Sequence, residues 1–274
     1  MSYEYLADVY DEFMEDTPYE YWRDCLLAAF KDRGITDGLV LDLGCGTGKM
    51  TRLLRDAGYD MIGVDGSMEM LNVATQIEAA RNDGAETTEE VTKLGGVELV
   101  KANHSDEILY LCQDMREFEL YGTVRAIISI CDCVNYLTEP EDLVECFKLV
   151  NNYLDPKGLF MFDFNTTYKY AEVIGDTTIA ENREKCSFIW ENFYDPETCI
   201  NEYDVTIFTE SEDNPGLFER NEETHIQRGY TLEEMKDIIK RAGLVFEEAF
   251  DAETGEEVAP DTERIFVLAR EQGK

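Results

Sequence analysis

The sequence has few basic residues for its length, and this shortage excludes several partners. It contains 24 Lys and Arg against 60 Asp and Glu, for a net charge of -36, and no run of basic residues. Binding a phosphate backbone requires clustered Lys or Arg. Nucleic acids and anionic membranes are therefore not expected as partners. The acid excess either keeps the surface soluble or favours a cationic ligand, and composition leaves both readings open.

Histidines, paired cysteines and long apolar runs are also scarce. His104 and His225 are the only histidines and are not clustered with other ligands, so no metal site is expected. The eight cysteines form no CxxC pair, which favours reduced and mostly buried thiols. No apolar run reaches transmembrane length, and the first residues resemble no signal or transit peptide. A cytoplasmic protein is expected.

What the sequence does contain is an alternation of strand and helix patterns. Strands are predicted at 39–44, 59–65, 107–115, 124–132 and 158–164, and helices at 21–34, 49–58, 67–82 and 139–154. This order predicts an α/β fold with a doubly wound, mostly parallel sheet. Strands at 244–250 and 263–270 would complete a seven-stranded sheet. The acidic connection 83–106 is too long for a simple loop and is interpreted as a surface insertion of unknown role.

The pattern changes after Asn165, where the predicted strands become longer and alternate with period two. They cover 186–196, 198–211 and 217–230 and indicate an antiparallel insertion. A helix follows at 231–243, with Thr231 and Glu234 in capping-box spacing and Gly243 at its end. We expect one domain from 1–182 and 229–274, and an insertion at 183–228. The insertion could form a substrate wall or lid, or a dimerisation surface.

The stretch LVLDLGCGTGKM, residues 39–50, carries the first functional signal. An apolar strand runs into Gly44, Gly46 and Gly48 and then into a helix, an arrangement that holds small molecules at the carboxyl end of a strand. The spacing GxGxG differs from the dinucleotide pattern GxGxxG, which would place glycine at Lys49. Asp42 would repel a pyrophosphate but attract an ammonium or sulfonium group.

Two further acids follow the next two strands. Asp65 ends the second strand, where a carboxylate can accept both hydroxyls of a ribose. Asp114 and Met115 end the third strand and could contact the edge and the face of an adenine. Any one of these acids could be an ordinary turn residue. Three acids at successive strand ends favour a nucleoside-binding site.

In order, LDLGCGTGKM, VDGSMEML, QDM and SICDCVNYL resemble the motifs of class I S-adenosylmethionine-dependent methyltransferases, which have a Rossmann-like fold. The resemblance covers Tyr19 to Asn165 and, more loosely, Thr231 to Arg270. It implies that the glycine turn holds the methionyl part, Asp65 the ribose and Asp114 the adenine amino group, with S-adenosylhomocysteine as product. The expected cofactor-binding residues are Asp42, Gly44, Cys45, Gly46, Gly48, Asp65, Gly66, Ser67, Met70, Asp114, Met115 and Cys131.

Two other segments resemble a bacterial small-molecule group that contains N-methyltransferases. These are LADVYDEFMEDTPYEYW near the start and HIQRGYTLEEM much later, and the resemblance implies that Tyr10 lies over cofactor and substrate. The proline-rich motif of DNA amino-methyltransferases and the Pro-Cys nucleophile of cytosine-C5 enzymes are absent, since CDCVNYL stands after the fourth strand. A small methyl acceptor, most simply an amine, is expected.

Methyl transfer from a sulfonium needs mainly alignment and exclusion of water, although an amine must lose a proton to a base or to water. The candidates for acceptor contact or base are Tyr10, Asp132, Asn135, Tyr136 and His225. Each could instead be structural, as a packing residue, a cap or a loop acid. A nicotinamide-dependent oxidoreductase and a non-catalytic S-adenosylmethionine-binding protein are the alternative functions. Homodimerisation stays open.

Overall fold

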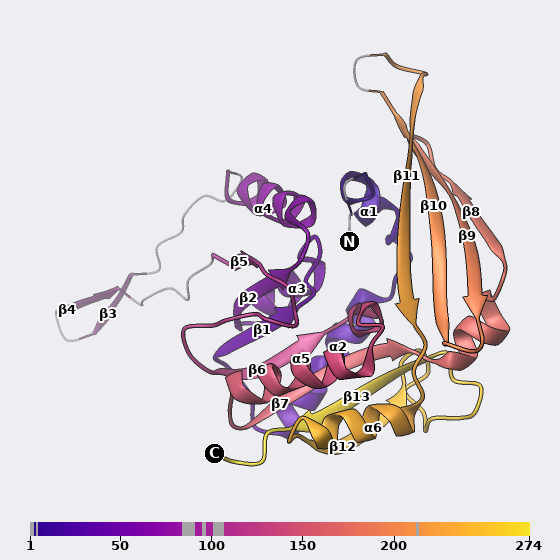
Figure 1. Ribbon diagram of the computed structural model, residues 1–274. Coiled ribbons are helices and arrows are strands. Elements are labelled where there is room, and N and C mark those ends of the chain that lie inside the picture. The colour runs from indigo at the N-terminus through magenta and orange to yellow at the C-terminus, as the bar shows by residue number, and fades with distance from the viewer. Residues whose placement is uncertain (1–2, 4, 84–90, 95–96, 101–106, 212–213) are drawn as a thin grey trace.

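The computed structural model describes residues 3, 5–83, 91–94, 97–100, 107–211 and 214–274, and its main element is a seven-stranded sheet (Figure 1). The strand order is β12-β13-β7-β6-β1-β2-β5, and only β13 runs against its neighbours. The predicted doubly wound, mostly parallel sheet is therefore confirmed. Its strands are β1 (Leu39–Leu43), β2 (Asp60–Asp65), β5 (Leu109–Cys112), β6 (Val124–Ser129), β7 (Leu154–Asn165), β12 (Val245–Asp251) and β13 (Arg264–Arg270).

Strand β1 is central because both of its faces are covered. It pairs in parallel with β2 on one side and β6 on the other. Leu41 and Leu43 belong to the core on one face of the sheet, while Val40 belongs to the core on the opposite face. A strand buried on both faces must be apolar at successive positions rather than at alternate ones, which explains the run LVLDL.

Helices cover both faces, as a doubly wound fold requires. Helices α2 (Tyr19–Asp32) and α3 (Lys49–Asp56) contribute to one core, and α5 (Pro140–Tyr153) and α6 (Leu232–Arg241) to the other. Helix α4 (Met68–Asp83) packs beside β2 and β5. The predicted capping box of α6 is confirmed, because Thr231 accepts from Glu234 N–H while the Glu234 carboxylate accepts from Thr231 N–H.

A second sheet stands beside the first as an upright wall (Figure 1). It is four-stranded and antiparallel, in the order β11-β10-β9-β8. The strands are β8 (Thr178–Asn182), β9 (Cys186–Asp195), β10 (Ile200–Glu210) and β11 (Phe218–Arg228). The three predicted strands of the insertion are present. The sheet also contains β8, which lies before the expected boundary at residue 183 and follows a π-helical turn at Lys169–Ile174.

A short N-terminal helix, α1 (Ala7–Phe13), lies between the second sheet and α4 (Figure 1). Leu6 and Val9 pack against Tyr203, Val205 and Ile207 on the inner face of β10. Because these contacts are apolar, α1 and the second sheet share a small core of their own.

The predicted surface insertion at 83–106 contains an antiparallel pair of strands, β3 (Val91–Leu94) and β4 (Val97–Val100), which extends away from the main sheet (Figure 1). The rest of that prediction, residues 84–90, 95–96 and 101–106, lies outside the described residues. Over the described part of the chain, no helix is long and apolar enough to cross a membrane.

Candidate active site

The glycine turn after β1 adopts the backbone conformation that its sequence predicts. Gly44, Gly46 and Gly48 have φ of 83°, 52° and 78°, in the left-handed region that favours glycine. A Cβ on Gly44 would lie 2.6 Å from the Cys133 sulfur, and one on Gly48 would clash with the Tyr110 hydroxyl. A Cβ on Gly46 would meet nothing within 4 Å. Two glycines therefore allow close packing, and the third leaves open space above the turn.

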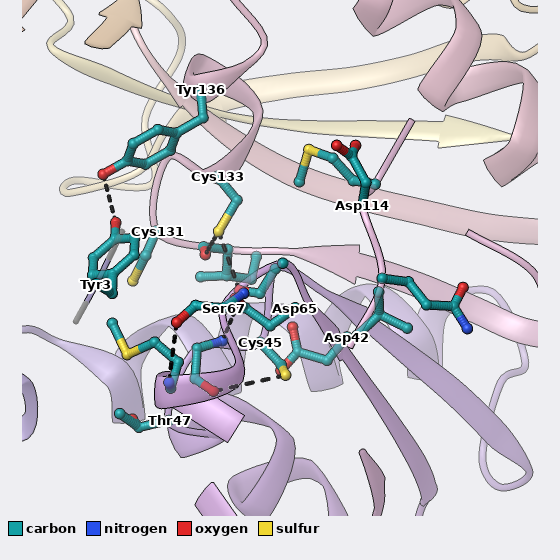
Figure 2. Close-up of a pocket in the computed structure, with 18 of the residues that line it drawn as sticks. Tyr3, Asp42, Cys45, Thr47, Asp65, Ser67, Asp114, Cys131, Cys133 and Tyr136 are labelled. Carbon is teal, nitrogen blue, oxygen red and sulfur yellow. Dashed lines mark hydrogen bonds between the residues drawn. The ribbon is translucent and has the colours of Figure 1, made fainter. Parts of the chain in front are cut away.

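A cavity of about 390 Å³ opens at the carboxyl ends of β1, β2, β5 and β6 (Figure 2). Its wall includes most of the residues singled out in the sequence. These are Tyr10, Asp42, Gly44, Cys45, Gly46, Asp65, Gly66, Ser67, Met70, Asp114, Met115, Cys131 and Tyr136. Gly48, Asp132, Asn135 and His225 lie outside the wall.

Asp42 and Asp65 bring two carboxyl groups to the floor of the cavity. Gly46 N–H donates to Oδ2 of Asp65 and Ser67 N–H to Oδ1, each at 2.8 Å, so the carboxylate links the glycine turn to the loop after β2. Asp42 accepts from the Thr51 hydroxyl at 2.6 Å. Burial raises the pKa of both carboxyl groups, to about 7 for Asp42, because the charged form loses hydration.

Asp114 lies on the opposite side of the cavity from Tyr3 and Tyr136 (Figure 2). Its carboxylate accepts from the Arg116 guanidinium at 3.0 and 2.6 Å and from Arg116 N–H at 2.8 Å. The bonds from Arg116 lower the pKa of Asp114 and keep it ionised. Arg116 also pairs with Asp142 at 3.2 Å, which fixes the loop after β5 to α5.

The backbone after β6 turns sharply. Cys131 and Asp132 have φ of 70° and 49°, which is uncommon for residues with a Cβ. Asp163 of β7, fully buried, holds this turn by accepting from Cys131 N–H at 2.7 Å and Asp132 N–H at 3.0 Å. Arg264 of β13 bridges Asp163 and Asp132 at 2.5 and 2.6 Å. The turn therefore aims Cys131 into the cavity and Asp132 into an ion-pair network behind it.

Two other candidates from the sequence also have partners outside the cavity. Asn135 is fully buried; its amide donates to the carbonyls of Asn165 and Arg228 at 2.9 and 2.7 Å and accepts from Asn165 N–H. It thereby ties β7 to the end of β11. His225, on β11, is 1% exposed and lies behind Tyr136, with 3.3 Å between its Nδ1 and the Tyr136 hydroxyl.

Tyrosines dominate one end of the cavity. Tyr3, Tyr10, Tyr19 and Tyr136 all line it, and the hydroxyls of Tyr3 and Tyr136 lie 2.5 Å apart (Figure 2). The rings of Tyr3 and Tyr10 meet edge to face at 6.2 Å. Burial raises the pKa of all four phenols well above 10, so they are neutral hydrogen-bonding groups.

Four cysteines line the cavity: Cys45, Cys112, Cys131 and Cys133. Burial raises the pKa of Cys45, Cys131 and Cys133. They are therefore protonated, weakly nucleophilic groups that behave as small apolar side chains. All eight cysteines of the chain are free, as predicted, although only three of them are buried and Cys112 is exposed.

Several wall residues were missed in the sequence. Thr47 sits inside the glycine turn itself, and Tyr3 and Tyr19 flank the Tyr10 segment, so the tyrosine-rich start of the chain was the available signal. The other missed wall residues lie in loops, and the positions of these loops depend on tertiary packing. The principal missed wall residues are Tyr3, Tyr19, Thr47, Gln113, Cys133 and Thr138.

Comparison with known proteins identifies the family. Residues 10–249 match the model of the methyltransferase domain family, which is most of the chain. The chain belongs to this family. YqeM of Bacillus subtilis (strain 168), provisionally named a methyltransferase, is 32% identical over 271 residues, or 98% of this chain and 97% of YqeM.

Solved structures agree in fold over nearly the whole length. An S-adenosylmethionine-dependent methyltransferase from Clostridium acetobutylicum has a TM-score of 0.80 and 26% identity, covering 99% of both chains. The sugar N-methyltransferase KedS8 of Streptoalloteichus has a TM-score of 0.69 and 13% identity, covering 94% of this chain and 92% of KedS8. The protein is therefore an enzyme, an S-adenosylmethionine-dependent methyltransferase, rather than a nicotinamide-dependent oxidoreductase.

The cavity wall is consistent with this cofactor. A Cβ added to Gly46 or Gly66 would meet nothing within 4 Å, and both glycines line the cavity. The protein therefore leaves space above two successive strand ends. The buried carboxyl group of Asp42 and the partly buried one of Asp65, near those strand ends, suit the hydroxyls and positive charge of an adenosyl sulfonium.

Proposed function

We propose that the enzyme transfers the methyl group of S-adenosylmethionine to the nitrogen of a small amine. The observation that carries this proposal is the shared cavity, in which four tyrosines face the same space as Asp42 and Asp65. The faces of electron-rich rings attract cations, and so do carboxylates. A net charge of -36 adds a field that draws in an ammonium form.

In this proposal Asp65 holds the ribose. Each carboxylate oxygen accepts one backbone N–H, from Gly46 and Ser67, so each retains a lone pair for an outside hydroxyl. Two adjacent ribose hydroxyls match two such oxygens. The bonds from the glycine turn also fix the position of the carboxylate before the cofactor arrives.

Asp114 would receive the adenine amino group. Its three bonds from Arg116 leave one lone pair of the carboxylate free, enough for one N–H donor. Met70 and Met115 also line the cavity and would pack on the flat ring. With adenosine at this end, the methionyl part extends over Gly44, Cys45 and Gly46, and the methyl group faces the tyrosines.

The cofactor supplies an activated methyl group and leaves as S-adenosylhomocysteine. The protein contributes alignment: Tyr10 and Tyr136 hold the acceptor, and α1 covers the site and excludes water. The second sheet acts as the wall of the acceptor end, because Tyr203 and His225 stand behind Tyr3 and Tyr136. The sugar N-methyltransferase KedS8, which shares the fold, supports a nitrogen acceptor.

The direct test is a screen of amine metabolites with S-adenosylmethionine, measuring S-adenosylhomocysteine release and product mass. We expect release that depends on one class of amine and a mass increase of one methyl group on its nitrogen. Cofactor binding is measured first, by calorimetry with S-adenosylmethionine, S-adenosylhomocysteine and NAD. Turnover of hydroxyl acceptors alone, with every amine inert, would refute the amine assignment.

Asp65→Asn tests the cofactor pose. The amide keeps one acceptor oxygen but loses the charge and one site for a hydroxyl, so we expect about 10- to 100-fold weaker cofactor binding by calorimetry. Asp60→Asn is the matched control, since Asp60 starts the same strand and lies outside the cavity wall. Equal affinity of the Asp65 variant and the wild type would contradict this pose.

A further inference from the structure

Behind the tyrosines lies a buried polar pair that methyl transfer as proposed does not use. Glu223 and His225 of β11 are 6% and 1% exposed. Oε2 of Glu223 and Nε2 of His225 lie 3.3 Å apart, yet neither atom makes an aligned hydrogen bond with any described residue. Burying two underused polar atoms costs folding free energy, so a role other than stability is expected of them.

The other oxygen of Glu223, Oε1, holds the backbone of the N-terminal segment in place. Oε1 accepts from Tyr5 N–H at 2.5 Å and from Leu6 N–H at 3.1 Å, just before α1. Glu223 therefore holds the segment that carries Tyr3 into the cavity. Among the described residues, Oε2 is left with His225 as its polar neighbour.

The contacts of Tyr136 and of Glu223 together assign the protons of the cluster. The Tyr136 hydroxyl contacts the hydroxyls of Tyr3 and Tyr203 at 2.5 and 2.9 Å and Nδ1 of His225 at 3.3 Å. A hydroxyl donates once and accepts twice. All three contacts are satisfied when Tyr3 and Tyr203 donate to Tyr136 and Tyr136 donates to Nδ1, and equally when Nδ1–H and one tyrosine donate to Tyr136 and Tyr136 donates to the other tyrosine. Glu223 decides between the two, because its carboxylate oxygen Oε2 lies 3.3 Å from Nε2 and can only accept a hydrogen bond; the first arrangement avoids two lone pairs facing each other. Neutral His225 then carries its proton on Nε2, toward Glu223.

We propose that Tyr3, Tyr136, His225 and Glu223 form a proton relay leading away from the acceptor nitrogen. The inference rests on the proposed amine acceptor. The N–H bond of the acceptor breaks, its electron pair stays on nitrogen, and the proton bonds to the Tyr3 oxygen. The Tyr3 proton moves to Tyr136, and the Tyr136 proton moves to Nδ1 of His225. Each tyrosine loses one proton and gains one, and the imidazole becomes an imidazolium.

The surroundings of His225 favour its protonated form, the imidazolium. The imidazolium faces the Glu223 carboxylate at 3.3 Å inside the protein, where opposite charges attract strongly. Among the residues that the structure describes, the other titratable groups facing His225 are Tyr3, Tyr136 and Tyr203, at ring distances of 4.9, 6.0 and 5.2 Å. Burial raises the pKa of all three phenols, so they pass a proton on without remaining as anions. Tyr3 touches the acceptor and is the catalytic residue, whereas His225 and Glu223 act through Tyr136.

The proton assignment can be tested without knowing the acceptor. The chain has two histidines, so the imidazole ¹⁵N spectrum of labelled protein is simple, and His104→Gln assigns it. We expect neutral His225 to be protonated at Nε2. In Glu223→Gln the amide oxygen can still hold Tyr5 and Leu6, while its NH₂ can donate to Nε2 and move the ring proton to Nδ1. The matched control Glu222→Gln, an exposed neighbour on β11, should leave the tautomer unchanged.

Activity with the amine found in the screen tests the relay itself. Glu223→Gln, His225→Asn and Tyr136→Phe should each lower kcat by about 10²-fold, the scale of general base catalysis, with unchanged calorimetric affinity for S-adenosylmethionine. Glu222→Gln should retain full kcat. Undiminished kcat in all three variants, or a wild-type His225 protonated at Nδ1, overturns the relay. A wild type that methylates no amine refutes the proposed function instead, and the tautomer measurement still judges the proton assignment.

Discussion

Among individual residues, Asp42 has the most unusual environment. It is the penultimate residue of the apolar strand β1, is 2% exposed, and accepts a hydrogen bond from Thr51 at 2.6 Å. Burial raises its pKa to about 7, and the nearby charge of Asp65 contributes in the same direction. In the absence of a bound cation, the folded protein therefore holds a proton at Asp42 that the unfolded chain releases near pH 4.

This shift predicts a pH dependence of stability. Since the folded state binds the proton more tightly, the contribution of Asp42 to the free energy of unfolding falls as pH rises from about 4 to about 7, by up to about 1.4 kcal/mol per unit. In Asp42→Asn the side chain does not titrate, so this loss of unfolding free energy disappears, while the amide oxygen can still accept the hydrogen bond from Thr51. Denaturant titrations should show equal stabilities at pH 4 and a variant more stable than wild type at pH 7.5. A stability difference that does not change with pH would contradict the prediction.

The glycine turn could be predicted from sequence at residue resolution, whereas the acceptor end could not. Gly44 and Gly46 lie within one contiguous motif, so local spacing was enough to place them on the wall. Asp132 was expected near the acceptor, but Arg264, over a hundred residues later, draws its carboxylate to the other side of the turn. Tyr3 was missed because its position depends on Glu223 of the second sheet, through the backbone of Tyr5 and Leu6.

At the scale of secondary-structure elements, α1 connects three parts of the site. It packs on the second sheet through Val9, carries Tyr10 into the cavity, and holds the glycine turn through Asp11, which accepts from the Thr47 hydroxyl at 2.6 Å. Arg52 of α3 adds an ion pair with Asp11 at 3.8 Å. A helix in this position must move if the cofactor enters from its side.

Weakening the contact between α1 and the glycine turn should therefore speed cofactor exchange. Asp11→Ala removes the bond from Thr47, worth about 1 kcal/mol, and we expect about fivefold faster release of S-adenosylhomocysteine in stopped-flow measurements. Asp8→Ala is the control on the same helix, because Asp8 is exposed and lies outside the cavity wall. If both variants release the product at the wild-type rate, α1 does not limit exchange.

The main strands and helices could be predicted because their own sequences carry the signal. The elements that were missed, α1 and β8, depend on contacts with other parts of the chain. Strands β1, β2, β6 and β7 have buried apolar runs, and α6 carries a complete capping box. Helix α1 has only seven residues, so it depends on tertiary contacts rather than on its own sequence. Strand β8 is nearly all exposed and shows no period-two pattern, since pairing with β9 rather than burial defines it.

At the scale of the whole molecule, the excess of negative charge produces an electrostatic repulsion that no single ion pair offsets. Carboxylates outnumber cationic side chains by 60 to 24, so the basic residues cannot supply one partner for each acid, and the excess carboxylates repel one another in the folded state. Ion pairs such as Arg220 with Glu222 are solvent-exposed, and exposed pairs typically contribute about 0–1 kcal/mol. Repulsion should therefore outweigh attraction among the surface charges.

Added salt should consequently stabilise the enzyme. Raising NaCl from about 0.01 to 0.15 M shortens the screening length from about 30 to about 8 Å, which weakens repulsion more than the short ion pairs. We expect the midpoint of thermal unfolding to rise by several degrees, since about 1 kcal/mol corresponds to about 2–4 °C for a protein of this size. KCl at equal ionic strength should give the same shift, because screening does not depend on the identity of the cation. A midpoint that stays constant or falls with either salt would show that attractive pairs, not net repulsion, dominate the surface electrostatics.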